Sequence, residues 1–311
     1  MWMQLRGVAG LASIAAMLCL SASASATGTE EPNTLSGRAK VYGSLDQSSL
    51  EQVTSASALS KELRFQNVAP TRIWKLLEHG EKVECLDCIP RVARLLYDSN
   101  AKTREISAWW LRRRIFGVFG KGEVYSQVLG VLGNPRESAV RRAQAANAIG
   151  EFLNPAGVEA VSKAALSDNA APVRLASVQA LERLNNEGSD QALGKALADS
   201  DENVRLAALH AVISVNVFSN PELVMRRFDD DSALVRRRAA EAVGAMRLAD
   251  AVMGLVALSS ESKESSADVR AAAVWALGQI ADPAAKPAVQ AALSDSSTLV
   301  KTAATISLRR L

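Results

Sequence analysis

The sequence predicts an all-α fold, an α-solenoid of about seven helical hairpins preceded by an N-terminal leader. Three observations lead to this prediction. A short motif recurs at nearly constant spacing, the apolar residues around each motif fall on one side of a helix, and the composition favours helix packing. Hydrophobic residues make up 48% of the 311 residues but aromatic residues only 5%, with Ala and Leu supplying much of the apolar content.

The N-terminus has the pattern of an export signal. Arg6 precedes an apolar run from Gly7 to Leu20, and the sequence SASASA then places small residues at Ala24 and Ala26, as a cleavage site requires. We therefore expect residues 1–26 to be a cleaved signal peptide and the protein to be periplasmic or secreted. The alternative is an uncleaved membrane anchor, for which about 20 apolar residues are usual.

Residues 27–60 are expected to form a flexible leader. Ser, Thr, Gly, Gln and Asn are frequent in this segment, large apolar residues are few, and no periodicity persists. The predicted solenoid occupies residues 61–311. It is expected to open with a capping helix after Pro70, in which the apolar residues are Ile73, Trp74, Leu76 and Leu77.

A hydrophobic or Thr residue followed by a basic residue recurs seven times in the predicted solenoid. The spacings between the basic residues are 37, 33, 31, 31, 34 and 31 residues, and these residues are Arg104, Arg141, Arg174, Arg205, Arg236, Arg270 and Lys301. The second copy fits better when it is shifted by one residue. Six copies have an acidic residue six positions earlier, and these are Asp98, Asp168, Asp199, Asp230, Glu264 and Asp295.

The offsets around each basic residue describe an amphipathic helix. Positions −1, +3, +6, +7 and +10 fall on one side at 100° per residue, and they are apolar and often Ala. Another helix precedes this one, and its start is marked by a capping residue before Pro, at Asn154-Pro155, Asn220-Pro221 and Asp282-Pro283. Because one hairpin cannot bury its apolar faces alone, we expect the copies to stack.

These units resemble HEAT repeats, in the short bacterial form that also occurs in phycobilin-lyase-like proteins. The resemblance is carried by DSDENVRLAALHAV (Asp199 to Val212) and SADVRAAAVWALGQI (Ser266 to Ile280). It implies that the repeated acidic and basic residues are structural and link the turns of adjacent repeats. The residues to which we apply this expectation are Asp168, Asp199, Asp230, Arg174, Arg205, Arg236 and Arg270.

Two cysteines, Cys85 and Cys88, form a C-L-D-C pair in the first repeat. An exported protein is expected to join them in a disulfide. Buried or free thiols, and a redox or metal function, are the alternatives. A helix start can lower the pKa of a thiol, whereas a zinc site would need two more ligands and His79 is the only candidate nearby.

Composition and motifs argue against catalysis and nucleic-acid binding. A net charge of +3 is too small for a nucleic-acid-binding domain, and His79 and His210 are too few for a multi-histidine metal centre. The sequence contains no phosphate-binding loop, serine-hydrolase elbow or zinc-protease motif. Among relatives of HEAT proteins, the di-iron hydroxylases need several His-Glu pairs, which this chain lacks. We therefore predict no enzyme activity, cofactor or metal.

The segment around Trp109 and Trp110 is unusual because Arg112, Arg113 and Arg114 follow it directly. One interpretation is a docking site for a protein or for anionic lipid headgroups, since Trp and Arg both favour interfaces. The other is that this first repeat caps the solenoid, with Trp110 packed inward and the arginines solvated. Membrane contact is therefore left open and is not predicted.

Positions +1, +5 and +8 lie opposite the predicted buried side and are expected to line an exposed inner surface. The +5 residues differ in chemistry, as recognition would allow, although unconstrained solvent positions would also differ. The predicted partner-binding residues are Trp109, Gln179, His210, Glu241 and Trp275, while Asn147 and Ile306 share their position.

The predicted function is a non-catalytic scaffold that binds an unidentified protein partner of the cell envelope on the concave face of the solenoid. The alternative is an envelope redox or chaperone-like accessory protein that uses Cys85 and Cys88.

Overall fold

The computed structural model describes residues 53, 55–63, 69–115, 122–216 and 218–311, all within one compact unit, Asp46–Leu311. The predicted signal peptide and most of the predicted leader lie outside the described residues. Helices and the turns between them account for the described part of the protein, and no β-strand occurs in it. The all-α prediction is therefore confirmed over this part of the sequence.

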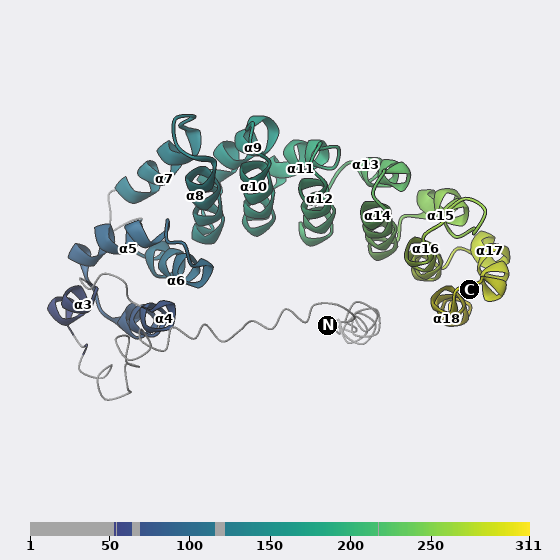
Figure 1. Ribbon diagram of the computed structural model, residues 1–311, viewed down its shortest axis with the longest axis horizontal. Coiled ribbons are helices and arrows are strands. Elements are labelled where there is room, and N and C mark those ends of the chain that lie inside the picture. The colour runs from purple at the N-terminus through teal and green to yellow at the C-terminus, as the bar shows by residue number, and fades with distance from the viewer. Residues whose placement is uncertain (1–52, 54, 64–68, 116–121, 217) are drawn as a thin grey trace, which may run out of the picture. The chain divides into compact units, whose positions relative to one another are not determined.

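Helical hairpins follow one another from residue 89 to the C-terminus (Figure 1). Their first helices are α5 (Ile89–Leu95), α7 (Glu123–Gly133), α9 (Val158–Ser167), α11 (Asp190–Ala196), α13 (Glu222–Met225), α15 (Val252–Leu258) and α17 (Lys286–Ala291). Their second helices are α6 (Ala101–Arg112), α8 (Ala139–Phe152), α10 (Ala171–Leu184), α12 (Glu202–Ser214), α14 (Ala233–Met246), α16 (Ala267–Ile280) and α18 (Thr298–Ser307). Each second helix packs on the second helix of the next hairpin, so these helices form one layer and the first helices another. The predicted α-solenoid is confirmed.

In the described part of the chain, two further helices precede the first hairpin. α4 (Pro70–His79) is the helix predicted after Pro70, and it packs on α6 through three buried side chains, Ile73, Leu76 and Leu77. α3 (Ala56–Glu62) begins inside the segment expected to belong to the leader. The Ser55 hydroxyl caps this helix by accepting from the Ala58 amide, and Leu59 is fully buried. Folded structure therefore begins before residue 61.

Capping side chains set the helix starts. Ser138, Ser232 and Ser266 accept amide hydrogen bonds in the first turns of α8, α14 and α16. Two of the predicted Pro-marked starts, at Asn154 and Asp282, each begin a short 3₁₀ turn that leads into the next helix. The third differs, because the Asn220 side chain donates to Asp190 of the preceding hairpin at 2.9 Å rather than capping α13.

The predicted buried side of the second helices is found in the structure. In α12 and the residue after it, all five positions are buried, and they are Val204, Ala208, Ala211, Val212 and Val215. In α14 and α16 the first four positions are buried, while the +10 residues Met246 and Ile280 are partly exposed. The small side chains at +3 and +6 let each hairpin close tightly, as the Ala-rich pattern indicated.

The +8 position differs from its prediction in three repeats, where it is a buried glycine rather than an exposed residue. A Cβ atom at Gly278 would lie 2.5 Å from the Ser307 Cβ, so only glycine allows α16 and α18 to come this close. The same contact joins Gly150 to Ala180 and Gly244 to Ala276. The prediction failed because it considered one hairpin, whereas each second helix also has neighbours in the adjacent repeats.

An ion-pair ladder joins successive repeats. Its five rungs each pair a second-helix arginine with an acid in the next repeat, and they are Arg142–Asp168, Arg174–Asp199, Arg205–Asp230, Arg236–Glu264 and Arg270–Asp295. Four rungs are two-pronged, with Nε and Nη2 donating to the two carboxylate oxygens over 2.7–2.9 Å. The carboxylates are buried, with side-chain exposures of 3–10%.

Each rung also fixes two turns. The Nη1 atom of Arg174 donates to the carbonyl of Asp168 at 2.9 Å, in the turn of its own repeat, while its other edge holds Asp199 of the next. Asp199 in turn accepts from the Asp201 amide at 2.8 Å. The repeated acids and arginines therefore link the turns of adjacent repeats, as the resemblance implied.

Substitution of Asp295 by Asn should lower the melting temperature strongly. Asp295 and Arg270 are each 3% exposed, and breaking a buried pair costs about 3–5 kcal/mol. Among the described residues, only the exposed Glu261, 3.9 Å from Nη2, would remain as an ion-pair partner of the buried Arg270. Thermal unfolding followed by circular dichroism would measure this, with the exposed Asp250→Asn variant as the matched control. Equal melting temperatures for the two variants would contradict the structural role of the ladder.

The ladder should also make stability depend on acidity. Hydrogen bonds from Arg270 hold the pKa of Asp295 below its usual value. Burial is the largest single influence on Asp168, Asp199 and Glu264 and acts to raise the pKa of each, but hydrogen bonds from an arginine and a backbone amide, together with the nearby arginine charges, outweigh it and lower the pKa. Stability from such groups is complete above the unfolded pKa of about 4 and is lost as the pH falls through the depressed folded values. Melting temperatures measured from pH 6 to pH 2 should therefore fall below about pH 4, and less steeply in Asp295→Asn.

Candidate interaction surface

The exposed side of the second-helix layer, here called the inner face, is formed by the +5 and +9 side chains of α6 to α18 and by those +8 side chains that are not buried glycines. Of the five residues predicted to bind a partner, only His210 is fully exposed, with 72% of its side chain accessible. The other four are partly buried, and they are Trp109, Gln179, Glu241 and Trp275. All five lie in the second-helix layer, one each on α6, α10, α12, α14 and α16.

Many polar side chains of the inner face pair with one another across repeats. His210 Nδ1 lies 2.9 Å from Glu182, and Arg183 lies 3.1 Å from Glu151 of the preceding repeat. Glu241 is held within its own helix by Arg237 at 2.8 Å and Arg238 at 2.6 Å. Such partly exposed pairs contribute about 0–1 kcal/mol each, so a binding partner can exchange them at small cost.

The Trp275 side chain is half-buried in the inner face and does not protrude from it. Its ring lies beside Gly244 of the preceding repeat, where a Cβ atom would be 3.0 Å from the Trp275 Cζ3. The indole Nε1 is buried and makes no hydrogen bond with the described residues. Sequence reasoning treated this residue as exposed because it could not foresee the room left by a glycine on the neighbouring helix.

The aromatic and basic segment of α6 is divided between the core and the surface. Trp110 is fully buried and donates through Nε1 to the Gly80 carbonyl at 3.3 Å. Arg114 is 3% exposed, lies 4.0 Å from the centre of the Trp110 ring, and donates to the Trp110 carbonyl at 2.9 Å. Burial lowers the pKa of Arg114. These contacts favour the interpretation that Trp110 packs inward in a capping repeat. That interpretation expected all three arginines to be solvated, but Arg114 is buried. Of the three arginines, only Arg113 is classed as exposed.

A polar hollow of about 390 Å³ opens where α6, α8 and α10 meet. It contains the +5 residues Asn147 and Gln179, which the sequence pattern placed on this face. It also contains Arg104, Gln144 and Arg183, which sequence reasoning did not select. Its complete lining is Leu96, Ala101, Arg104, Glu105, Ala108, Gln144, Asn147, Ala148, Glu151, Gln179 and Arg183. Further hollows lie along the first-helix layer, beside α9 and between α5 and α7.

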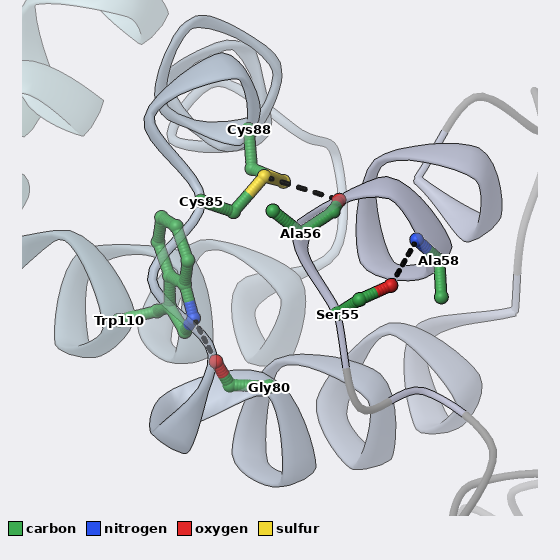
Figure 2. Close-up of a disulfide and its surroundings, with 7 residues drawn as sticks. All are labelled: Ser55, Ala56, Ala58, Gly80, Cys85, Cys88 and Trp110. Carbon is green, nitrogen blue, oxygen red and sulfur yellow. Dashed lines mark hydrogen bonds between the residues drawn. A yellow bond between two sulfur atoms is a disulfide. The ribbon is translucent and has the colours of Figure 1, made fainter.

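Cys85 and Cys88 are joined by a disulfide that closes the turn before α5 (Figure 2). Both residues are buried, with exposures of 2% and 0%. The Cys85 sulfur lies 3.5 Å from the Ala56 carbonyl oxygen, so α3 covers the bond. The described residues include no group of His, Cys, Asp and Glu arranged to hold a metal ion. No described helix combines the length and apolar character needed to span a membrane.

Comparison with known proteins identifies the repeats. A family model of HEAT repeats matches residues 126–213 and 220–309, more than half of the sequence. No curated protein sequence matches this one at a significant level.

Solved structures with low sequence identity share the arrangement of helices. A protein from a structure of Kap95p bound to RanGDP is 14% identical, with a TM-score of 0.64 over 86% of this chain and 43% of its own. The Escherichia coli protein YibA is 20% identical, with a TM-score of 0.55 over 86% of this chain and 98% of its own. Human deoxyhypusine hydroxylase, in complex with glycerol, is 20% identical over 86% of this chain and 99% of its own, with a TM-score of 0.37. For the first two, whose TM-scores exceed 0.5, the likeness concerns the fold alone.

Removal of the disulfide should loosen α3 before it affects the rest of the stack. Closing so short a loop contributes about 2 kcal/mol by the chain-entropy relation, and α3 packs directly on this turn. Hydrogen exchange of the segment 55–63 in Cys85→Ala/Cys88→Ala should be faster than in the parent protein, while α14 and α16 stay unchanged. Unchanged protection of α3 would show that its docking does not depend on the disulfide.

Proposed function

The chain belongs to the HEAT-repeat family, and we propose that it is a non-catalytic scaffold that binds a protein partner through the inner face. The observation that carries the proposal is the contrast between two sets of positions on the same helices. The stacking positions repeat Val, Ala and Gly, whereas the +5 positions read Trp109, Asn147, Gln179, His210, Glu241, Trp275 and Ile306. Because the +5 residues differ from repeat to repeat while the stacking positions do not, they are the part of each repeat that can encode a partner.

The arrangement of the repeats supports this proposal. Stacked second helices present a broad surface to which each repeat adds one strip, and such surfaces suit long protein partners. The Kap95p structure, which shares this fold, is itself a complex of two proteins. The sequence shows no motif for catalysis, and the polar groups of the inner face are largely paired with one another. These features favour binding over a reaction.

A cell-envelope location is the second part of the proposal. The export pattern of residues 1–26 supports it, and a disulfide between Cys85 and Cys88 is typical of proteins in oxidising compartments. A redox or chaperone-like function of this pair is the alternative. Both cysteines are buried beneath α3, so thiol exchange would first require α3 to move, and we therefore favour a structural disulfide.

Crosslinking on the two layers would test the binding face. A photoreactive amino acid at His210, on the inner face, should capture a defined partner in the native envelope. The same group at Met253, which is 78% exposed on α15 of the other layer, should not. Mass spectrometry would identify the captured protein. Equal capture at both positions, or capture only at Met253, would contradict the proposed face.

Substitutions on α12 should weaken that capture without unfolding the protein. His210→Ala combined with Ile213→Ala removes two exposed inner-face side chains, the latter 43% exposed. Truncating a binding hot spot costs about 2 kcal/mol, which corresponds to roughly a 30-fold weaker affinity. The melting temperature should stay within about 2 °C of the parent because neither position belongs to the stacking set. Met253→Ala is the matched control, and a loss of affinity in that variant would show that the outer layer also binds.

Processing of the N-terminus tests the location. N-terminal sequencing of the mature protein from the envelope fraction should start near Thr27, since the cleavage pattern ends at Ala26. Recovery of the intact protein from the cytoplasmic fraction would rule out export while leaving the proposed binding face untouched.

A further inference from the structure

In each rung of the ladder, the two edges of the arginine guanidinium bind different groups. One edge of each guanidinium, at Nη1, donates to the carbonyls of the turn before its own helix. The other edge, formed by Nε and Nη2, holds the carboxylate of the next repeat. In Arg236, for example, Nη1 lies 2.8 Å from the Asp230 carbonyl, while Nε lies 2.7 Å and Nη2 2.9 Å from the carboxylate of Glu264.

Arg104 occupies the same position in α6 and makes only the first half of this set. Its Nη1 donates to the carbonyls of Asp98 at 2.8 Å and Ser99 at 2.9 Å, so the guanidinium is oriented as in the other repeats. No carboxylate pairs with Arg104 among the residues that the structure describes. The edge that binds an acid in five later repeats is therefore open.

The missing acid has a visible cause in the sequence. Where the third repeat has Asp168 at the end of its first helix, the second repeat has Asn134. Both side chains accept the amide two residues later, from Arg136 at 3.0 Å and from Ala170 at 2.9 Å. Asn134 keeps the local turn but carries no charge, and it is exposed rather than covered by the arginine of the preceding repeat.

Arg104 lines the polar hollow between α6, α8 and α10. The other charged groups of this hollow are already engaged, since Glu105 lies 3.0 Å from Lys102 and Glu151 lies 3.1 Å from Arg183. The uncharged polar groups around them are the side-chain amides of Gln144, Asn147 and Gln179. Arg104 is thus the one charged group of the lining without an ion-pair partner in the described structure. At about 390 Å³ the hollow can take a side chain with its flanking backbone.

We propose that the hollow is a carboxylate-binding site, in which an acidic group of the protein partner takes the place of the missing rung. The inference rests on the proposed scaffold function and adds the chemistry of one contact. The ligand carboxylate accepts from Nε and Nη2 of Arg104 in the two-pronged geometry of the later rungs, with the neighbouring amide of Gln179 available to its remaining lone pairs and backbone. The carboxylate comes from an Asp or Glu residue or from the C-terminus of the partner.

Titration of the full ¹⁵N-labelled protein with blocked pentapeptides would test the site. The Nε–Hε resonance of Arg104, assigned by its absence from Arg104→Lys, should shift with a peptide whose central residue is aspartate. The isosteric asparagine peptide should bind at least about tenfold more weakly, the equivalent of about 1.4 kcal/mol. A third peptide, with central asparagine and a free C-terminal carboxylate, separates the two sources. A response to this peptide alone assigns the site to the partner's terminus.

Matched variants make the outcome specific. Arg104→Lys keeps the charge but loses the planar fork, so affinity for the aspartate peptide should fall about tenfold. Arg136→Lys alters an exposed arginine outside the hollow and should bind like the parent protein. The ladder resonances, such as that of Arg236, report that each variant remains folded.

Equal binding of the aspartate and asparagine peptides, or no shift of the Arg104 resonance with either carboxylate source, would overturn the inference. Partner capture at His210, measured in the same Arg104→Lys variant, separates the two proposals. Capture of the partner without any peptide response at Arg104 would leave the scaffold function standing and remove the carboxylate site.

Discussion

The close approach of neighbouring second helices is the constraint on which the rest of the structure depends. Glycine at +8 and Ala or Ser at +6 of the next repeat allow this approach, and the arginine–acid ladder fixes the turns at the end of the same helices. Small residues therefore cannot be exchanged at these positions, whereas the +5 residues, which lie on the other side of each helix, differ from repeat to repeat. The proposed binding surface is made of the positions whose residue type this close packing does not determine.

Much of this fold was predictable because its determinants repeat. The spacing of the basic residues indicated the number of hairpins, and the buried positions of α12 followed from helical periodicity alone. Contacts between repeats were harder to foresee. The +8 glycines, the half-buried Trp275 and the Asn220–Asp190 bond all depend on which residue of the next hairpin lies opposite. A pattern within one unit carries no information about that register.

The sequence contains a signal for the polar hollow that was not recognised as one, namely a repeat that lacks its acidic residue. Six of seven copies carried an acid before the basic residue, and the exception was the second copy. A repeat that departs from the common pattern can have diverged without consequence, or its altered positions can serve a function. The structure distinguishes them here, because Arg104 retains the orientation of a ladder arginine although its partner is absent from the described residues. A residue kept in position without its usual partner is a better indicator of a site than an unusual residue.

The ladder also has a mechanical consequence. Each rung clamps two consecutive turns, so a force along the stack is passed from repeat to repeat through buried charge pairs. Between the first and second repeats the described residues form no such ion pair, and Gln144 donates to the Asp98 carbonyl at 3.3 Å. We therefore expect the stack to bend more easily at this junction than at the junctions that carry a rung. Because the hollow opens at the same place, a charged group that fills it is expected to stiffen the stack there.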